Sequence, residues 1–128
     1  MKRVVRTCCG TPLTEEKRAV PGMPELVRNE LERLGGFDAL AGRIPATGEL
    51  EEKSRVHRAL ADPIRLAILY LLRDQPLCVC IINRFLHIGD SKLSYHLTIL
   101  KESGLIAGEY HGNWIIYSLT SLGRNSIS

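Results

Sequence analysis

The sequence is poor in aromatic residues and in long apolar runs. It contains two Phe, one Trp and four Tyr among 128 residues, so aliphatic side chains must fill the core, which suits a mainly helical protein. No stretch approaches the roughly 18 consecutive apolar residues of a membrane-spanning helix. Residues 1–6, MKRVVR, include three basic residues but are followed by Cys8 and Cys9 instead of the apolar segment of a secretion signal. We therefore expect a cytoplasmic protein whose thiols are kept reduced.

An excess of one charge and the motifs of enzymes are also missing. The 17 Lys and Arg residues against 14 Asp and Glu residues give a net charge of +3, which permits nucleic-acid binding but does not argue for it. There is no Cys-x-x-Cys after a strand, no Gly-rich phosphate loop and no Ser/His/Asp constellation. The sequence therefore predicts that the protein is not an enzyme.

The first part of the chain, residues 1–48, is expected to be an N-terminal arm and helical extension. Residues 1–22 mix basic residues, cysteines and prolines. Pro24 is well placed to begin a helix over residues 24–34, which Gly35 and Gly36 end. A short piece at 37–41 and a Gly/Pro-containing break at 42–48 complete this part. We expect it to serve dimerisation and sensing.

The second part, residues 49–128, has the pattern of four helices followed by a hairpin. The helices are expected at residues 49–61, 63–72, 77–86 and 91–103, and the strands at 106–110 and 114–119. A four-residue connection containing Gly89 joins the last two helices, and Asp90 or Ser91 can cap the second of them. A helix, a short turn, a helix and a hairpin form a winged helix-turn-helix. The expected fold class is therefore mainly α with a small β-hairpin.

The last helix carries a polar face that could contact DNA. Placing Leu93, Leu97 and Leu100 toward the core turns hydroxyls, a phenol and a lysine outward. Such groups can meet base edges and phosphates. Alone, this face would be an ordinary solvated helix surface, but the order of the elements favours DNA recognition. The candidate contacts on this helix are Ser91, Lys92, Ser94, Tyr95 and Thr98. His96 flanks the apolar stripe and is expected to pack or to form a hydrogen bond.

The four cysteines form two pairs. Cys78 and Cys80 would lie about 200° apart around a regular helix, so their sulfurs could not bind one ion without local unwinding. A position near a helix N-terminus favours the Cys78 thiolate. The alternative is that both are small buried hydrophobic residues. Cys8 and Cys9 have no packing reason to lie on the arm, and soft thiolates select arsenite, cadmium, lead or copper(I).

At four places the sequence resembles the ArsR/SmtB family of bacterial and archaeal metalloregulatory repressors. Residues 59–69, ALADPIRLAIL, resemble the family's ALADPTRLxIL opening, and residues 77–80, LCVC, resemble the LCVCDL box of its arsenic- and cadmium-sensing branches. Residues 91–106 resemble its SxxSxHLxxLxxxGLI recognition helix, and residues 112–119 are similar to its wing. The resemblance runs from about residue 52 to residue 119.

The resemblance implies a homodimeric repressor that binds double-stranded operator DNA. It implies release when a thiophilic ion, As(III) or Cd(II)/Pb(II), binds as the inducer, with no ion required for folding. Some members complete the ion site with N-terminal cysteines of the same or the other subunit. Cys8 and Cys9 are therefore candidate ligands beside Cys78 and Cys80. Three thiolates would suit arsenic, and four would suit cadmium or lead.

Three departures from the family pattern qualify these expectations. The wing turn carries His111 and Asn113 around its Gly where the family usually has Arg or Lys, although both remain candidate DNA contacts. Asn83 stands where some arsenic sensors have a third cysteine. The tail after residue 119 is too short for the long C-terminal helix that supplies dimer contacts and a His/Asp zinc site in many members. We therefore expect the dimer interface to use residues 24–34 and 49–61.

Two alternatives remain open. The same cysteines could form a thiol redox switch within the same DNA-binding fold, although a disulfide between residues two apart would be strained. A winged helix used only for protein–protein contact would not need sulfurs on the helix that supports the recognition helix.

Overall fold

The computed structural model describes residues 20–128, and the chain divides into two compact units between Glu51 and Glu52. The first unit contains α2 (Glu25–Arg33) and α3 (Gly36–Ala41). Pro24 precedes the first turn of α2 as its N-cap, and the positive φ of Gly35, 104°, ends the helix. The two helices bury only Ala41, so this unit has almost no core of its own.

The second unit begins within α4 (Thr47–Leu60), which is followed by α5 (Pro63–Leu71). Asp62 separates the two helices and caps α5, because its carboxylate accepts hydrogen bonds from the backbone N–H groups of Ile64 and Arg65 at 2.8 and 3.1 Å. Pro63 fits directly behind this cap because the first turn of a helix leaves its N–H groups without an intrahelical partner.

The helix predicted at residues 77–86 is shorter than expected, because its first two residues form a strand. β1 (Leu77–Cys78) pairs with a later strand, and α6 (Val79–Leu86) begins only after it. Cys78 is the N-cap of α6, with the extended angles φ −80° and ψ 160°. The prediction that a helix begins at residue 77 is therefore wrong. The backbone of Leu77 and Cys78 pairs with a strand more than 35 positions away, a partner that local patterns do not reveal.

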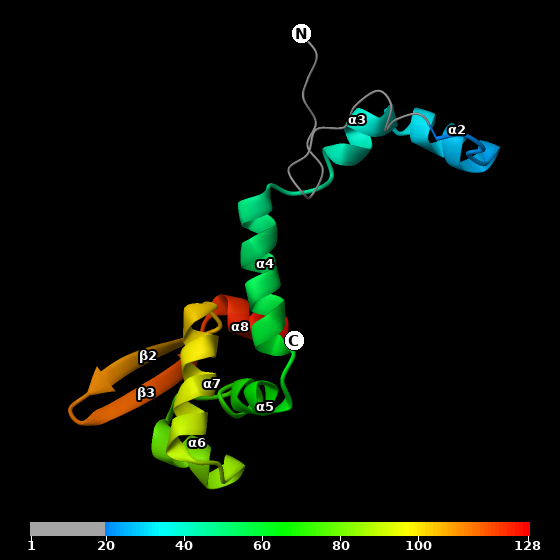
Figure 1. Cartoon of the computed structure of the whole chain (residues 1–128). Helices are drawn as coiled ribbons and strands as arrows, with labels where there is room; N and C mark the ends of the chain where they lie inside the picture. The colour runs from blue at the N-terminus through cyan, green and yellow to red at the C-terminus, as the bar shows by residue number, and fades with distance from the viewer. Residues whose placement is uncertain (1–19) are drawn as a thin grey trace. The chain divides into compact units, whose positions relative to one another are not determined.

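The expected hairpin is part of a three-stranded antiparallel sheet with the order β1-β3-β2. β2 (Ile106–His111) and β3 (Trp114–Leu119) project from the helices as a wing (Figure 1). Gly112 has a φ of 63° in the turn between them, a conformation that costs glycine little. The short helix α8 (Ser121–Ser126) ends the fold.

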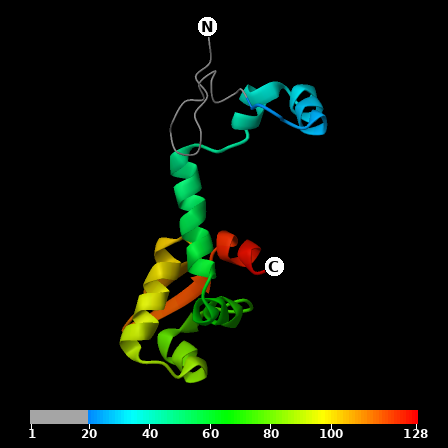
Figure 2. The ribbon, with the colours of Figure 1, turned by 45° about the vertical axis from the view of Figure 1, so that its right-hand side comes forward.

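A single aliphatic core joins the elements of the second unit. Its largest fully buried side chains come from α5 and its C-cap, from α6, from α7 (Asp90–Glu102) and from the segment before β2: Ile68, Leu69, Leu72, Ile82, Leu93, Leu100 and Leu105. α7 packs against α5 and β2, and α6 lies beside the N-terminal end of α7 in Figures 1 and 2. The mainly helical winged helix-turn-helix predicted from the sequence is confirmed.

Candidate nucleic-acid interface and thiol pair

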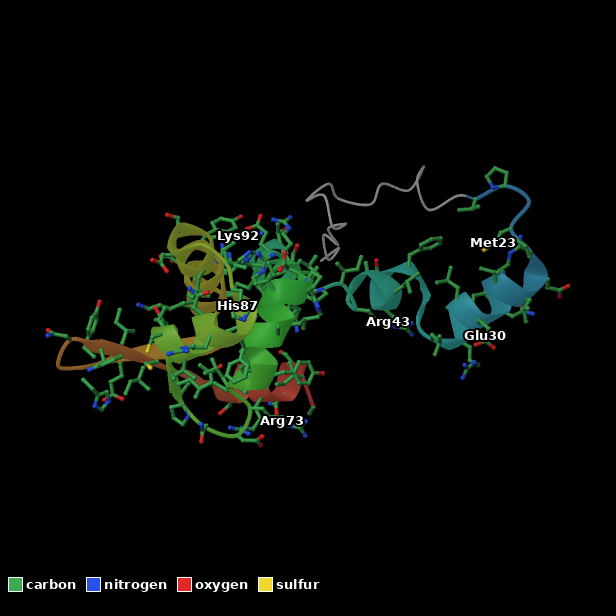
Figure 3. The ribbon with its side chains drawn as sticks, turned by 90° about the horizontal axis from the view of Figure 1, so that it is seen from below. Met23, Glu30, Arg43, Arg73, His87 and Lys92 are labelled. Atoms are coloured by element: carbon green, nitrogen blue, oxygen red, sulfur yellow. The ribbon has the colours of Figure 1, made fainter. Side chains whose placement is uncertain are left out.

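The recognition helix α7 begins at a glycine. Gly89 is its N-cap and has no side chain to offer, so the expectation that Asp90 or Ser91 caps this helix is wrong. Asp90 lies in the first turn, where a carboxylate is favoured by the helix dipole. His87, labelled in Figure 3, adopts a left-handed conformation with φ 52° and turns the chain between α6 and α7.

The polar face of α7 is open to solvent. Leu93, Leu97 and Leu100 are buried, and the ring of Tyr95 is 61% exposed on the opposite side. Lys92, labelled in Figure 3, is the third residue of the helix. The other exposed polar side chains of this face are those expected from the sequence: Ser91, Lys92, Ser94 and Thr98. The Thr98 hydroxyl donates to the backbone oxygen of Ser94 at 2.8 Å, so its oxygen remains free to accept.

His96 lies behind this face and is only 4% exposed. Its Nδ1 is 3.1 Å from Nη1 of Arg65, which comes from α5. The same guanidinium donates from Nε to the backbone oxygen of Ala59 at 2.8 Å and from Nη2 to that of Arg58 at 3.1 Å. Arginine has only donors, so Nδ1 of His96 must accept and its proton must lie on Nε2. His96 therefore forms a hydrogen bond, as expected, but its partner was not found from the sequence.

The wing turn carries fewer positive charges than the sequence family would suggest. His111 and Asn113 are exposed at the turn, and Nε2 of His111 is 3.6 Å from a carboxylate oxygen of Glu109. Sequence reasoning missed two large exposed rings beside them, Tyr110 at 75% and Trp114 at 58% exposure. The wing therefore presents two exposed aromatic rings and one histidine, whose ring lies next to the Glu109 carboxylate.

The structure brings the sulfurs of Cys78 and Cys80 together, with their Sγ atoms 2.9 Å apart. This corrects the expectation that a regular helix would hold them on opposite sides. Cys78 is extended at the edge of the sheet, so only Cys80 follows helical geometry. Cys80 is exposed and Cys78 is half-buried, so the alternative of two buried packing residues is also wrong.

The hydrogen bond between the two thiols shifts their pKa values in opposite directions. The Cys80 S–H donates to the Cys78 sulfur and lowers the pKa of Cys78, and the backbone N–H of Ile81 lowers it further. The same hydrogen bond raises the pKa of Cys80, as do its burial and the neighbouring Cys78 charge. Cys78 therefore ionises before Cys80, and the pair can present one thiolate before both protons are lost.

At the thiol pair, the described part of the chain provides an ion with two sulfur ligands. Within residues 20–128, no group of three His, Cys, Asp or Glu side chains is arranged to hold a metal ion. The candidate ligands Cys8 and Cys9 lie outside the described residues. A third or fourth ligand must therefore come from residues 1–19 or from another molecule.

Asn83 connects α6 to the start of the recognition helix. It lies on α6, three residues after Cys80, and its Oδ1 accepts a hydrogen bond from the backbone N–H of Ile88 at 3.2 Å. Its Nδ2 donates to the Asp90 carboxylate at 3.4 Å. The side chain thus spans the turn before α7. The sequence showed only that a third cysteine is missing here, and it gave no sign of this structural role.

The described helices include none that is both long enough and apolar enough to cross a membrane.

Residues 62–107 match the arsR family of bacterial regulatory proteins. The chain is 41% identical over 79 residues to the arsenical resistance operon repressor of Bacillus subtilis, covering 61% of this chain and 75% of that protein.

Two further relatives support the same assignment. Identity to the transcriptional repressor SmtB of Mycobacterium tuberculosis is 39% over 70 residues, which cover 55% of this chain and about half, 52%, of that protein. The homodimeric winged helix-turn-helix DNA-binding domain Mb0332 of Mycobacterium bovis superposes with a TM-score of 0.57 at 28% identity, covering 62% of this chain and 74% of that one. The chain therefore belongs to the arsR family: it is a transcriptional repressor with a winged helix-turn-helix DNA-binding domain, and not an enzyme.

Proposed function

We propose that this repressor leaves its operator when a thiophilic ion, arsenite or Cd(II)/Pb(II), binds Cys78 and Cys80. The observation that carries the proposal is the 2.9 Å separation of the two Sγ atoms at the exposed start of α6. Thiolates are the ligands that soft ions prefer, and the lowered pKa of Cys78 supplies the first of them. Relatives named as an arsenical resistance operon repressor and as SmtB support an ion as the signal.

Cys8 and Cys9 are the proposed source of the remaining ligands. The pair alone gives two thiolates, whereas trivalent arsenic is suited by three and cadmium or lead by four. Since residues 20–128 contribute no third ligand, the N-terminal arm of the same or the other subunit would complete the site. Each thiol that binds must lose its proton, so ion uptake should weaken as the pH falls.

The path from the thiol pair to the recognition helix is short. An ion held by both sulfurs replaces the hydrogen bond between them. Cys78 is fixed in the sheet by its pairing with Ile116 of β3, so the adjustment falls on the first turn of α6. Asn83 lies on the next turn and holds the backbone of Ile88 and the side chain of Asp90. Movement of α6 therefore loosens the start of α7.

The operator contacts proposed for α7 are those of its exposed face, and the wing adds His111 and Asn113. Recognition helices of this motif present their N-terminal residues to the major groove, which assigns Lys92 to a phosphate and Tyr95 to a base edge or sugar. Residues 49–128 would form the DNA-binding part, with Ser91, Ser94 and Thr98 as the remaining contacts.

A homodimer is the proposed form that binds DNA. Two-fold readers of this class need two recognition helices about 34 Å apart. Residues 24–34 and 49–61 are the proposed interface, with residues 1–48 serving dimerisation and sensing. The absence of any buried side chain in α2 supports this, because so small a unit cannot bury its own apolar face. The Mycobacterium bovis relative is described as homodimeric.

The deciding experiment is an ion titration of the repressor–operator complex. A fluorescent duplex, selected by the wild-type protein from a random library, would be titrated with arsenite or Cd(II) in a non-thiol reductant. We expect the ion to release the wild-type protein from the duplex. It should release neither the Cys78→Ser, Cys80→Ser double variant nor either single variant. All of these variants should still bind the duplex when no ion is present. A tenfold loss of operator affinity needs only about 1.4 kcal/mol of coupling.

The controls separate the remaining readings. Cys8→Ser or Cys9→Ser should weaken ion affinity without abolishing release. If arsenite or Cd(II) still releases the double variant, the pair is not the sensor. If hydrogen peroxide releases the wild-type protein and neither ion does, a thiol redox switch replaces the ion-binding proposal.

A further inference from the structure

One guanidinium ties the end of α4 to the middle of the recognition helix. Arg65, on α5, donates to the backbone oxygens of Arg58 and Ala59 on α4 and to Nδ1 of His96 on α7, at 2.8–3.1 Å. The C-terminal end of α4, α5 and α7 lie next to one another in both Figure 1 and Figure 2. Three helices therefore meet at a single side chain.

Each end of this connection is constrained. The last carbonyl groups of a helix have no intrahelical donors, and Ala59 is completely buried, so its oxygen benefits from a donor inside the protein. At the other end, His96 is buried and can accept at Nδ1 only while its proton is on Nε2. Arg65 itself is oriented by the cap of Asp62, which accepts from its backbone N–H.

The strength of the hydrogen bond between Arg65 and His96 depends on its direction, whereas the packing of the aliphatic core does not. Apart from His96, the buried side chains of α7 are leucines. Aliphatic contacts tolerate small rotations of a helix because they have no preferred direction. A charge-assisted hydrogen bond does have one. His96 also contacts the ring of Tyr95 edge to face, with centroids 5.3 Å apart. A rotation of α7 that breaks the bond to Arg65 therefore also moves the largest side chain of the exposed face.

We propose that Arg65 and His96 are positioning residues that fix the rotation of the recognition helix relative to α4 and so set operator affinity. Neither touches the DNA. The proposal rests on the proposed reading of DNA by the exposed face of α7. This positioning role requires a hydrogen-bond acceptor at the position of Nδ1 and several donors at the position of the guanidinium. The volume of either side chain alone would not supply it.

Paired variants test this requirement. His96→Asn keeps an acceptor where Nδ1 stands, and His96→Leu removes it while keeping the bulk. Arg65→Lys keeps the charge but cannot reach three acceptors at once. The matched control is Arg124→Lys, because Nη1 of Arg124 also donates to a backbone oxygen, that of Arg73, at 3.1 Å, but holds no part of α7.

Operator affinity would be measured by fluorescence anisotropy on the duplex selected by the wild-type protein. The folded fraction of each variant would come from urea titration. We expect His96→Leu and Arg65→Lys to bind at least tenfold more weakly while remaining folded. His96→Asn and Arg124→Lys should stay within threefold of the wild type. ¹⁵N NMR of the wild-type protein should show the His96 proton on Nε2.

Several results would overturn the proposal. It fails if His96→Leu binds as tightly as His96→Asn, if every affinity loss follows the loss of folded protein, or if His96 carries its proton on Nδ1. Tyr95→Ala distinguishes this failure from that of the DNA-reading face. If Tyr95→Ala weakens binding and His96→Leu does not, only the positioning role is wrong; if neither variant weakens binding, the proposed face of α7 is also wrong.

Discussion

Replacing Asp62 with alanine removes the cap on which both α5 and Arg65 depend. The backbone of Asp62 is extended, with φ −146° and ψ 128°. Its carboxylate accepts hydrogen bonds from the backbone N–H groups of Ile64 and Arg65. Alanine leaves these two donors without their partner inside the protein. Asparagine keeps an oxygen at the same place but removes the charge, so the two variants separate the hydrogen bonds from the electrostatics.

The expected loss follows from these contacts. An aspartate N-cap contributes about 0.5–2 kcal/mol to the free energy of unfolding, and a negative charge at a helix N-terminus adds about 0.3–1 kcal/mol. We expect Asp62→Ala to lower the free energy of unfolding by about 1–2 kcal/mol at pH 7, and Asp62→Asn by about half as much. Each kcal/mol corresponds to about 4–8 °C in Tm for a domain of this size.

The loss should depend on pH in a defined direction. Burial alone would raise the pKa of Asp62, but the N–H donors of Arg65 and Ile64, with the positive charge of Arg65, lower it below the ordinary value of 3.8. A lowered pKa in the folded state means that the carboxylate stabilises the protein above pH 3.8. That stabilisation disappears as the pH falls through the folded-state pKa.

Urea unfolding of the wild type and both variants, followed by circular dichroism between pH 2.5 and pH 7, tests this reasoning. The difference between wild type and Asp62→Ala should be largest near pH 7 and should shrink toward pH 2.5. The difference between wild type and Asp62→Asn should also shrink as the pH falls. An equal difference at both ends would refute the electrostatic part, and no difference at pH 7 would refute the cap itself.

Three further predictions address the functional surfaces. Tyr95→Ala and Lys92→Ala should each weaken operator binding without unfolding the protein, and Lys92→Ala should lower the salt slope by about one; unchanged affinity in both would mean that the face is misplaced. Iodoacetamide should alkylate Cys78 before Cys80, and Cys80→Ala should raise the pH at which Cys78 reacts, as mass spectrometry of peptides would show; the reverse order would contradict the shared hydrogen bond. Deleting residues 1–48 should weaken dimerisation in sedimentation experiments, and a full-strength dimer would contradict the proposed interface.

The recognition helix was predictable because its pattern is local. Leu93, Leu97 and Leu100 recur at helical spacing, and that spacing alone places Tyr95 on the exposed side. Gly112 likewise marks the wing turn through its own backbone preference. In both cases the cause and its effect lie within a few residues of each other, so the sequence contains the whole argument.

The thiol pair was misjudged because its geometry has a distant cause. Cys78 is extended because its backbone pairs with Ile116, and nothing near residue 78 in the sequence specifies that pairing. The bond between Arg65 and His96 joins residues 31 positions apart, and no spacing rule connects them. Nothing in the sequence marked Asn83 either, because the N–H of Ile88 needs a side-chain partner only once the turn has formed.

The two polar connections to α7 act at different places, and this limits what a signal can do. Asn83 holds the first turn of the helix through Asp90, whereas Arg65 holds its middle through His96. If an ion binds at the start of α6 as proposed, it would act on the first connection and leave the second in place. Since the leucines of α7 remain buried in either case, the expected response is a displacement of the N-terminal end of α7 and not unfolding of the domain. That end carries Lys92, so a small displacement there is enough to weaken operator binding, and removal of the ion would restore it without refolding.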